Sequence, residues 1–181
     1  VQMGHVHPIT QTINEISDIF HSLGFSVAPD KNSPEVETEY YHFDGLNFPK
    51  DHPARDMQDT FYTNIAPHVI LRGQTSGAQV RVMEDMKPPI RVIVPGRVYR
   101  NENINSRKNN FFHQIEGLYI DKNVTFADLK GVLNEFLRLY FGSSRPTRFR
   151  SSFFPFTEPS VEIDVQCIMC QGKGCKTCSG T

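Results

Sequence analysis

The sequence predicts an α+β fold in which an antiparallel β-sheet is flanked by helices. Apolar residues recur at helical spacing from Pro8 to Leu23 and again from Phe126 to Tyr140. Runs rich in β-branched and aromatic residues predict strands at 25–28, 90–94, 97–101, 111–120, 148–150 and 160–166. Because 181 residues suit one domain with a real core, we expect a single domain over 1–181.

Both long helices have start and stop signals. The first begins at Pro8 and ends before Gly24, a common helix-ending residue. The second begins at Thr125, where Asp128 completes a capping-box pattern, and it ends before Gly142. Both stripes of apolar residues predict helices that pack on the sheet.

Two shorter segments lie between the predicted strands. Ser76 followed by Val80, Met83 and Met86 predicts a short helix. The segment 47–59 is rich in Pro, Asp and His, which predicts a loop, and a loop of this length is usually functional or flexible.

Composition excludes several classes of protein. The 19 Lys and Arg residues nearly balance 20 Asp and Glu residues, so no overall field attracts a polyanion. No run reaches the ~18 apolar residues of a membrane span, and the start VQMGHVHPIT lacks a signal-peptide pattern. All four cysteines lie in the last 15 residues, which argues against a disulfide framework of the secreted type. We therefore expect a cytosolic (cytoplasmic) protein without a membrane partner.

Two predicted strands carry charged groups on a face that also holds a large aromatic residue. Alternation places Phe112, Gln114 and Glu116 on one face of the strand 111–120. Arg100 and Glu102 share a face of the preceding strand. If the two strands form a hairpin, a guanidinium and a second carboxylate lie beside the first set.

These polar groups have two interpretations. They fit the solvated face of an ordinary sheet, with charges paired across strands. The aromatic residues, together with Phe154 and Phe156 at the same two-residue spacing and a long polar loop over 103–110, favour a pocket instead. Arg binds phosphate, an aromatic ring stacks on a base, and a carboxylate accepts from an amino group, so ATP plus an amino acid would fit.

Three motifs in order carry a resemblance to a known family: HPARDM at 52–57, FHQIEG at 112–117 and FPFTEPS at 154–160. The chain resembles the catalytic domain of class II aminoacyl-tRNA synthetases, and within that class the α subunits of bacterial phenylalanyl-tRNA synthetases. The resemblance places motif 1 at about 8–48 and motif 2 at about 94–121. It implies an incomplete class II catalytic core, whose third motif would lie beyond Thr181, and hence a chain that is inactive alone.

The resemblance also implies roles for individual residues. Arg100 would hold the α-phosphate as the catalytic residue, Glu102 would accept from the adenine amino group, and Phe112 would stack on adenine. The implied amino-acid-binding residues are Gln74, Ser76, Gln114, Glu116, Phe154 and Phe156. The chain departs from the family pattern at Gly73 and Gln74, which stand where the family has Thr-His, and at Lys108, where many relatives have histidine.

The implied reaction joins L-phenylalanine to ATP, with Mg²⁺, as phenylalanyl-adenylate and then transfers the acyl group to tRNA(Phe). The implied partner is the β subunit of an α2β2 heterotetramer. A different class of function stays open: a non-catalytic, synthetase-like, zinc-containing module that binds an amino acid, a nucleotide or RNA.

The cysteines form two C-x-x-C pairs, Cys167 with Cys170 and Cys175 with Cys178. Each pair can chelate one tetrahedral ion from a tight turn, and four thiolates leave no open position for catalysis. Reduced thiols or a redox pair would leave the duplicated spacing unexplained. The spacing therefore predicts a C-terminal knuckle of four cysteines over 167–178 that holds structural Zn²⁺.

Overall fold

The computed structural model describes residues 4–57, 59–105, 108–143, 145–154 and 157–179. Phe156, which was predicted to line the phenylalanine pocket, lies outside the described residues. The chain forms two compact units, Val1–Val124 and Thr125–Thr181, and each is described by itself. The single-domain organisation and the motif boundaries stay predictions.

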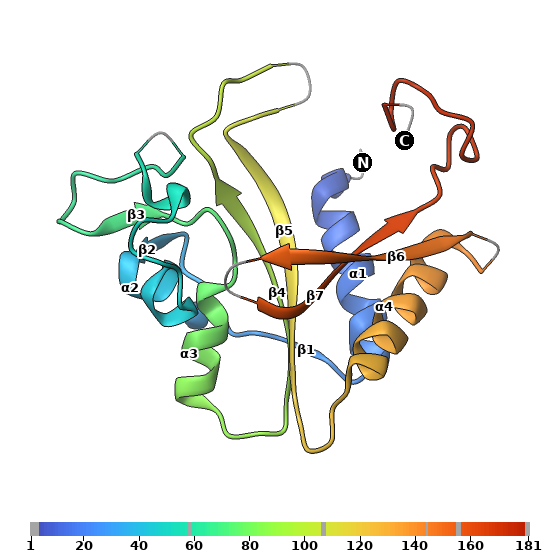
Figure 1. Cartoon of the computed structure of the whole chain (residues 1–181), viewed down its shortest axis with the longest axis horizontal. Coiled ribbons are helices and arrows are strands. Elements are labelled where there is room, and N and C mark those ends of the chain that lie inside the picture. The colour runs from blue at the N-terminus through green and yellow to red at the C-terminus, as the bar shows by residue number, and fades with distance from the viewer. Residues whose placement is uncertain (1–3, 58, 106–107, 144, 155–156, 180–181) are drawn as a thin grey trace. The chain divides into compact units, whose positions relative to one another are not determined.

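The first unit carries most of the secondary structure (Figure 1). Its helices are α1 (Pro8–Ser22), α2 (Glu39–His42) and α3 (Gly77–Asp85), and its 3₁₀ turns are η1 (Asp30–Asn32), η2 (Asp44–Leu46) and η3 (Pro53–Arg55). Its strands are β1 (Ser26–Val27), β2 (Val36–Thr38), β3 (Val69–Leu71), β4 (Ile90–Tyr99) and β5 (Phe111–Ile120).

The predicted hairpin is confirmed, since β4 and β5 pair antiparallel from Ile90 opposite Ile120 to Tyr99 opposite Phe111. Two details of the prediction were wrong. The strands predicted at 90–94 and 97–101 are one strand, because Pro95 stays within the ladder opposite Ile115. The sheet is also mixed and not purely antiparallel, because β1 pairs parallel with β4. The sequence of a two-residue strand does not indicate whether the strand pairs parallel or antiparallel. Its direction follows from the position of α1, which ends a few residues before it.

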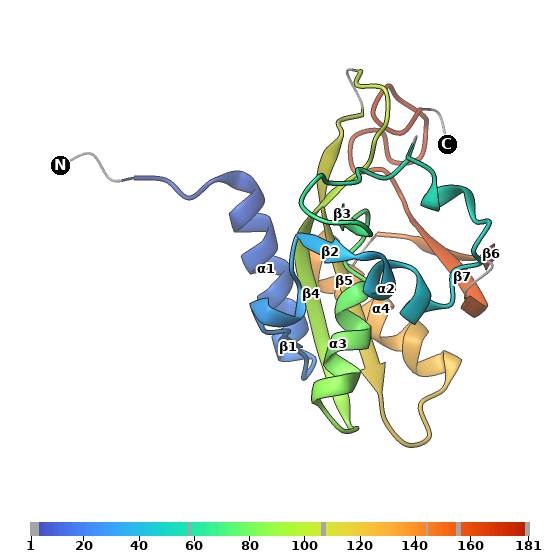
Figure 2. The ribbon, with the colours of Figure 1, turned by 90° about the vertical axis from the view of Figure 1, so that its left-hand side faces the viewer.

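Helices cover both faces of the β4–β5 hairpin (Figure 2). On one face Ala78 and Val82 of α3 pack with Val92 and Val94 of β4 in the main buried cluster. On the other face α1 delivers Phe20, which meets the Phe25 ring edge-on at 5.4 Å. The predicted helices at 8–23 and after Ser76 are thus confirmed. Their apolar stripes are only partly buried, because α1 buries Phe20 while Ile9 is exposed, and α3 buries Val80 and Val82 while Met83 is exposed.

A small second sheet in this unit was not predicted. The strands β2 and β3 pair antiparallel over three residues each, and Ile70 of β3 is completely buried. Glu37 of β2, opposite Ile70, is buried and receives two hydrogen bonds from Arg81 of α3, at 3.1 and 2.6 Å. Three-residue strands are too short to show a period of two, which is why the sequence pattern missed them.

The second unit contains α4 (Phe126–Phe141), β6 (Thr147–Phe154) and β7 (Thr157–Val165). The capping box is confirmed, because Thr125 Oγ1 accepts from the Asp128 amide while the Asp128 carboxylate accepts from the Thr125 amide. The strands β6 and β7 form an antiparallel hairpin longer than the predicted 148–150 and 160–166. Arg148 and Arg150 both donate to Asp164 across this hairpin. Such cross-strand ion pairs stabilise strand segments that an apolar pattern does not predict.

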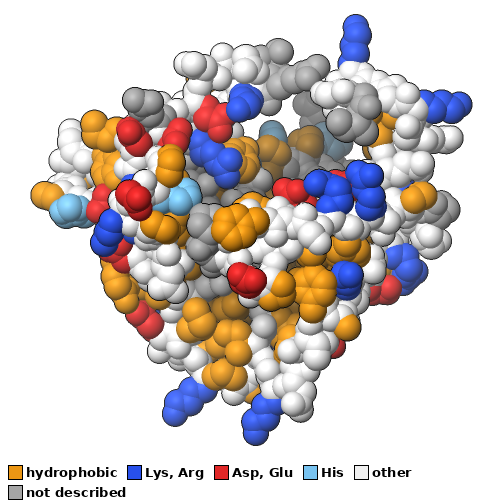
Figure 3. Space-filling view, viewed as in Figure 1, with side chains coloured by type: hydrophobic (Ala, Val, Ile, Leu, Met, Phe, Trp, Pro, Cys, Tyr) orange, Lys and Arg blue, Asp and Glu red, His pale blue; other side chains and the backbone are white. Residues whose placement is uncertain are grey.

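Charged side chains of both signs are interspersed over the face seen in Figure 3, in keeping with a net charge of −1. Within the described part of the chain, none of the helices combines the length and the apolar character that crossing a bilayer requires.

Candidate active site

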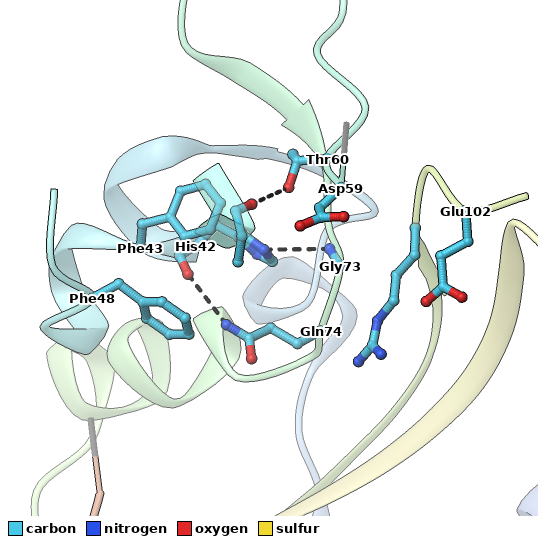
Figure 4. Close-up of a pocket in the computed structure, with 10 residues that line it drawn as sticks. His42, Phe43, Phe48, Asp59, Thr60, Gly73, Gln74 and Glu102 are labelled. Carbon is cyan, nitrogen blue, oxygen red and sulfur yellow. Dashed lines mark hydrogen bonds between the residues drawn. The ribbon is translucent and has the colours of Figure 1, made fainter. Parts of the chain in front are cut away.

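The first unit contains a pocket of about 340 Å³ between the segment 42–60, the turn before α3 and the end of β4 (Figure 4). One part of its wall is aromatic and the other is charged. The lining residues are His42, Phe43, Phe48, Ala54, Asp59, Thr60, Gly73, Gln74, Arg100 and Glu102. Three residues that the sequence predicted for the site, Gln74, Arg100 and Glu102, therefore share one cavity.

Arg100 was predicted within a strand, but β4 ends at Tyr99 and Arg100 follows it directly, beside Phe112 of β5. The guanidinium carbon of Arg100 lies 5.0 Å from the centre of the Phe112 ring. Val98 is opposite Phe112, and the Arg100 amide continues the ladder by donating to the Asn110 carbonyl at 2.9 Å. A cation beside an aromatic face suits a phosphate next to a flat base.

Glu102 forms an ion pair with Lys108 at the end of the hairpin. The Lys108 Nζ lies 2.7 Å from the carboxylate, and this hydrogen bond lowers the pKa of Glu102 below its ordinary value. Asn101 fixes the strand end by donating its amide to the Asp59 carbonyl and its Nδ2 to the Met57 carbonyl, at 3.0 and 2.8 Å. Glu102 is thus held as an ionised acceptor at the pocket.

Glu116 is held by the N-terminal turn of α3. Its carboxylate accepts from Ser76 Oγ at 2.6 Å, from Thr75 Oγ1 at 3.4 Å and from Gln79 Nε2. The N-terminus of a helix also favours negative charge. The structure therefore joins Ser76 to Glu116, both predicted, and adds Gln79, which sequence analysis missed although it stands one helical turn after Ser76.

Gln114 lies on the same face as Glu116 and Phe112, opposite Gly96 of β4. Its Oε1 is buried and accepts no hydrogen bond from the described residues. A buried acceptor of this kind normally has a partner, so the atom is suited to a bound group.

His42 is a pocket residue that sequence analysis did not select. It is 3% exposed, and its Nε2 accepts from the Gly73 amide at 3.4 Å while its carbonyl accepts from Gln74 Nε2 at 3.3 Å. Burial, with Arg55 and Arg72 adding repulsion, lowers the pKa of His42 to about 4. The imidazole is therefore neutral at pH 7.

The HPARDM loop is fixed by its arginine. Arg55 donates to the Asp44 carboxylate at 2.9 Å and to the Phe48 carbonyl at 2.8 Å, and its guanidinium lies over the Phe43 ring. These contacts hold the aromatic wall of the pocket. Sequence analysis gave this loop no role, and its structural role follows from contacts that only folding creates.

Phe154 lies in the second unit, at the end of β6, opposite Thr157. Phe156 is outside the described residues, and the pocket belongs to the first unit. Their role toward a substrate ring stays a prediction.

The four cysteines gather into one cluster within the second unit. Their sulfur atoms all lie within 4.8 Å of one another, and three of the Sγ–Sγ distances are 3.9, 3.7 and 3.8 Å. These distances exceed a disulfide bond and match the ~3.8 Å edge of a tetrahedron whose centre lies ~2.3 Å from each sulfur. Gly172 and Gly174 adopt φ of 80° and 88°, a left-handed conformation that glycine reaches without a steric cost.

Backbone donors favour thiolate at one of these cysteines. The amides of Cys178 and Thr177 lower the pKa of Cys175 to about 6, whereas burial raises the pKa of Cys170 to about 11. None of the four cysteines is in a disulfide bond. A donor set of four sulfurs at tetrahedral spacing fits a soft or borderline metal ion.

Comparison with known proteins places these features in a family. The family model described as "tRNA synthetases class II core domain (F)" matches residues 1–178. Proteins named phenylalanine–tRNA ligase alpha subunit from Gloeobacter violaceus and Bacteroides thetaiotaomicron are each 55% identical over the whole chain, which covers 52% of either protein. The one from Caldanaerobacter subterraneus is 57% identical over 98% of the chain and 51% of that protein. The chain thus spans about half the length of these curated relatives.

Solved structures agree on the fold. A pyrrolysyl-tRNA synthetase from Desulfitobacterium hafniense superimposes with a TM-score of 0.63, at 16% identity, over 90% of this chain and 56% of that one. A structure of its PylSc protein gives 0.60 at the same identity, over 87% of this chain and 52% of that one. The class II synthetase core is therefore the fold of this chain.

Proposed function

The chain belongs to the family of class II tRNA synthetase core domains of the phenylalanine type, and on that premise we propose that it forms the activating site of a phenylalanine–tRNA ligase α subunit. The proposed substrates are L-phenylalanine, ATP and tRNA(Phe), and the proposed partner is a β subunit. The proposed product, phenylalanyl-tRNA, is consumed in translation, so the proposed location is the cytoplasm.

The proposed chemistry needs no nucleophilic side chain. A carboxylate oxygen of phenylalanine attacks the α-phosphorus of ATP, and the bond to pyrophosphate breaks as phenylalanyl-adenylate forms. A ribose hydroxyl at the end of the tRNA then attacks the acyl carbon, and AMP leaves. Rate therefore depends on alignment and on stabilising the charge that develops on phosphate oxygens.

The residues divide between the two substrates. Arg100 binds the α-phosphate, Phe112 stacks on adenine and Glu102 accepts from the adenine amino group. Gln74, Ser76, Gln114 and Glu116 form the amino-acid end. The observation that carries this assignment is the convergence of Arg100, Glu102 and Gln74 on one pocket, with Glu116 fixed on the neighbouring strand. In the second unit Phe154 and Phe156 are proposed to contact the phenylalanine ring.

Mg²⁺ is implied by the family, and the described pocket offers the carboxylate of Asp59. Oxygen donors of this kind fit Mg²⁺, which binds mainly through phosphate oxygens and water with few protein ligands. When bound, Mg²⁺ supplies neutralisation of the triphosphate charge.

Phenylalanine-dependent exchange of labelled pyrophosphate into ATP tests the proposed function, using the complete ligase assembled from this subunit and its β partner. We expect exchange with L-phenylalanine and none with L-leucine. Binding of phenylalanine or nucleotide without exchange or aminoacylation would contradict the enzyme and favour the non-catalytic binding module.

We also propose that Cys167, Cys170, Cys175 and Cys178 hold one structural Zn²⁺. Support comes from the tetrahedral spacing of the sulfurs and from the two glycines that allow the tight turns. With four thiolates the ion would be closed to substrate, so its contribution would be to the stability of the second unit.

Metal analysis of protein purified without chelators tests the zinc proposal. We expect about one zinc per chain, and we expect Cys178→Ser to remove most of it while Ser179→Ala, beside it, retains it. Zinc well below one equivalent in the unaltered protein would contradict the proposal, as would a different metal in its place.

A further inference from the structure

We propose that His42 is a positioning residue that fixes Gln74 in the orientation in which it meets the amino-acid substrate. The inference deepens the proposed function, because it rests on Gln74 being part of the amino-acid end of the pocket. His42 and Gln74 are 32 residues apart in sequence, and the pocket brings them into contact.

His42 binds the turn before α3 at two points (Figure 4). Its ring Nε2 accepts from the Gly73 amide at 3.4 Å, and its backbone carbonyl accepts from Gln74 Nε2 at 3.3 Å. The second contact orients the Gln74 amide, because the opposite orientation would place Oε1 against a carbonyl oxygen. Gln74 is thus left with Oε1 and one N–H for a ligand.

The first contact requires a neutral imidazole of one tautomer. Since Nε2 accepts, the proton of the neutral ring lies on Nδ1, which is buried and has no partner among the described residues. The charged groups around the ring favour this neutral state, because the positive charges of Arg55 and Arg72 oppose protonation of the ring. An imidazolium could not accept from the Gly73 amide.

The backbone of Gly73 lies close to the His42 ring. A Cβ added to Gly73 would lie 3.4 Å from His42 Nε2 and 3.4 Å from the Tyr99 carbonyl oxygen. The backbone amide can therefore approach the ring without a side chain between them. His42, Gly73 and Gln74 thus form one contact unit at the two positions where the chain departs from the family's Thr-His pair.

The remainder of the turn connects this unit to Glu116. Ser76, two residues after Gln74, donates to the Glu116 carboxylate at 2.6 Å. The turn 73–76 is therefore fixed at one end by His42 and at the other by Glu116. Loss of the ring contact would release Gly73, and with it the Gln74 end of the turn, while the Ser76 end stays in place.

The test compares His42→Phe with His42→Gln in the complete ligase, by pyrophosphate exchange and by direct binding of L-phenylalanine. Phenylalanine keeps the ring shape but removes the acceptor, whereas glutamine carries an oxygen that can accept from the Gly73 amide. Both variants keep the backbone carbonyl of residue 42, so they test the ring contact that holds the turn at Gly73, next to Gln74. We expect His42→Phe to raise the KM for phenylalanine about tenfold, with the KM for ATP changed less than about twofold and kcat nearly unchanged, which corresponds to the loss of one hydrogen bond. His42→Gln is expected to stay within about threefold of the unaltered enzyme.

The matched control is His113→Phe, the same substitution on β5, on the face opposite Gln114. It should leave the KM values for phenylalanine and for ATP unchanged. Equal KM values for His42→Phe and the unaltered enzyme would overturn the inference, and so would parallel losses for ATP and phenylalanine. Failure of the unaltered ligase to exchange pyrophosphate would instead count against the proposed function, which separates the two ideas.

Discussion

Ser76 Oγ donates to the carboxylate of Glu116 at 2.6 Å, across 40 residues of sequence. Ser76 precedes the first turn of α3, and Glu116 lies in the middle of β5. With Thr75 and Gln79 as further donors, the contact fixes a carboxylate at the positive end of a helix. It also ties α3, which packs on this face of β4 and β5, to the proposed amino-acid end of the site.

Glu116→Gln tests the charge of this carboxylate. We expect the KM for phenylalanine to rise at least about tenfold, because a charged acceptor for the substrate ammonium group is lost. Kinetics of pyrophosphate exchange provide the measurement. Glu135→Gln, on α4 and paired with Arg138, is the control and should leave the kinetics unchanged. An unaltered KM in Glu116→Gln would exclude direct recognition by this residue.

Arg100→Lys tests the guanidinium beside Phe112. Lysine retains the charge but not the planar fork, so we expect kcat for adenylate formation to fall about 100-fold. Single-turnover measurement of adenylate formation reports that step. Arg97→Lys, whose guanidinium lies 5.7 Å from the centre of the Phe111 ring, is the matched exchange and should have little effect. Equal losses in the two variants would contradict a specific role of Arg100.

Lys108→Met should raise the pKa of Glu102 toward its ordinary value of 4.5, because the hydrogen bond from Lys108 is the main cause of the lowered pKa. A titration of the labelled carboxyl carbon by NMR measures it. Lys31→Met removes a different ion pair, with Asp85, and should leave the Glu102 titration in place. A titration that does not move in Lys108→Met would mean that the ion pair does not form in solution.

His42 should make stability depend on pH. Its folded pKa of about 4 lies below the ordinary 6.5, so the unfolded chain binds more protons between these values. The contribution of His42 to the free energy of unfolding is therefore fully present above pH 6.5. It falls by up to about 3 kcal/mol as the pH falls toward 4.

Urea unfolding at pH 7 and at pH 4.5 measures this effect. Other groups titrate in the same range, including Asp44 and Glu39, whose pKa values are lowered in the folded protein. The difference between the unaltered chain and His42→Phe isolates the histidine. We expect the variant to lose less stability on acidification, and equal losses would place the His42 pKa near its ordinary value.

Two glycine substitutions should change stability in opposite directions. A Cβ at Gly96 would collide with the guanidinium of Arg72, which is buried and donates to the carbonyls of Arg97 and Ser33. We expect Gly96→Ala to lower the free energy of unfolding by at least about 2 kcal/mol. Gly131 of α4 has open space around its Cβ direction, so Gly131→Ala should raise it by about 0.5–1 kcal/mol. Thermal and urea unfolding distinguish the two signs.

The sequence by itself determined the features that depend on local periodicity. The apolar spacing after Pro8 and after Thr125 predicted α1 and α4, because a helix repeats every 3.6 residues within a single segment. Alternation along 111–120 placed Phe112, Gln114 and Glu116 on one face, and the cysteine spacing indicated one cluster. The three motifs HPARDM, FHQIEG and FPFTEPS, in that order, also indicated the family, and the family model confirms it.

Only the tertiary structure decided how distant segments meet. The parallel pairing of β1, the short strands β2 and β3, and the contacts of Gln79 and His42 with the site all join residues far apart in the chain. Their physical origin is packing: Gly96 leaves space that Arg72 fills, the backbone of Gly73 lies close to the His42 ring, and buried polar groups must find partners wherever the fold places them. No period in the sequence encodes such contacts, because they depend on the shape of the assembled interior.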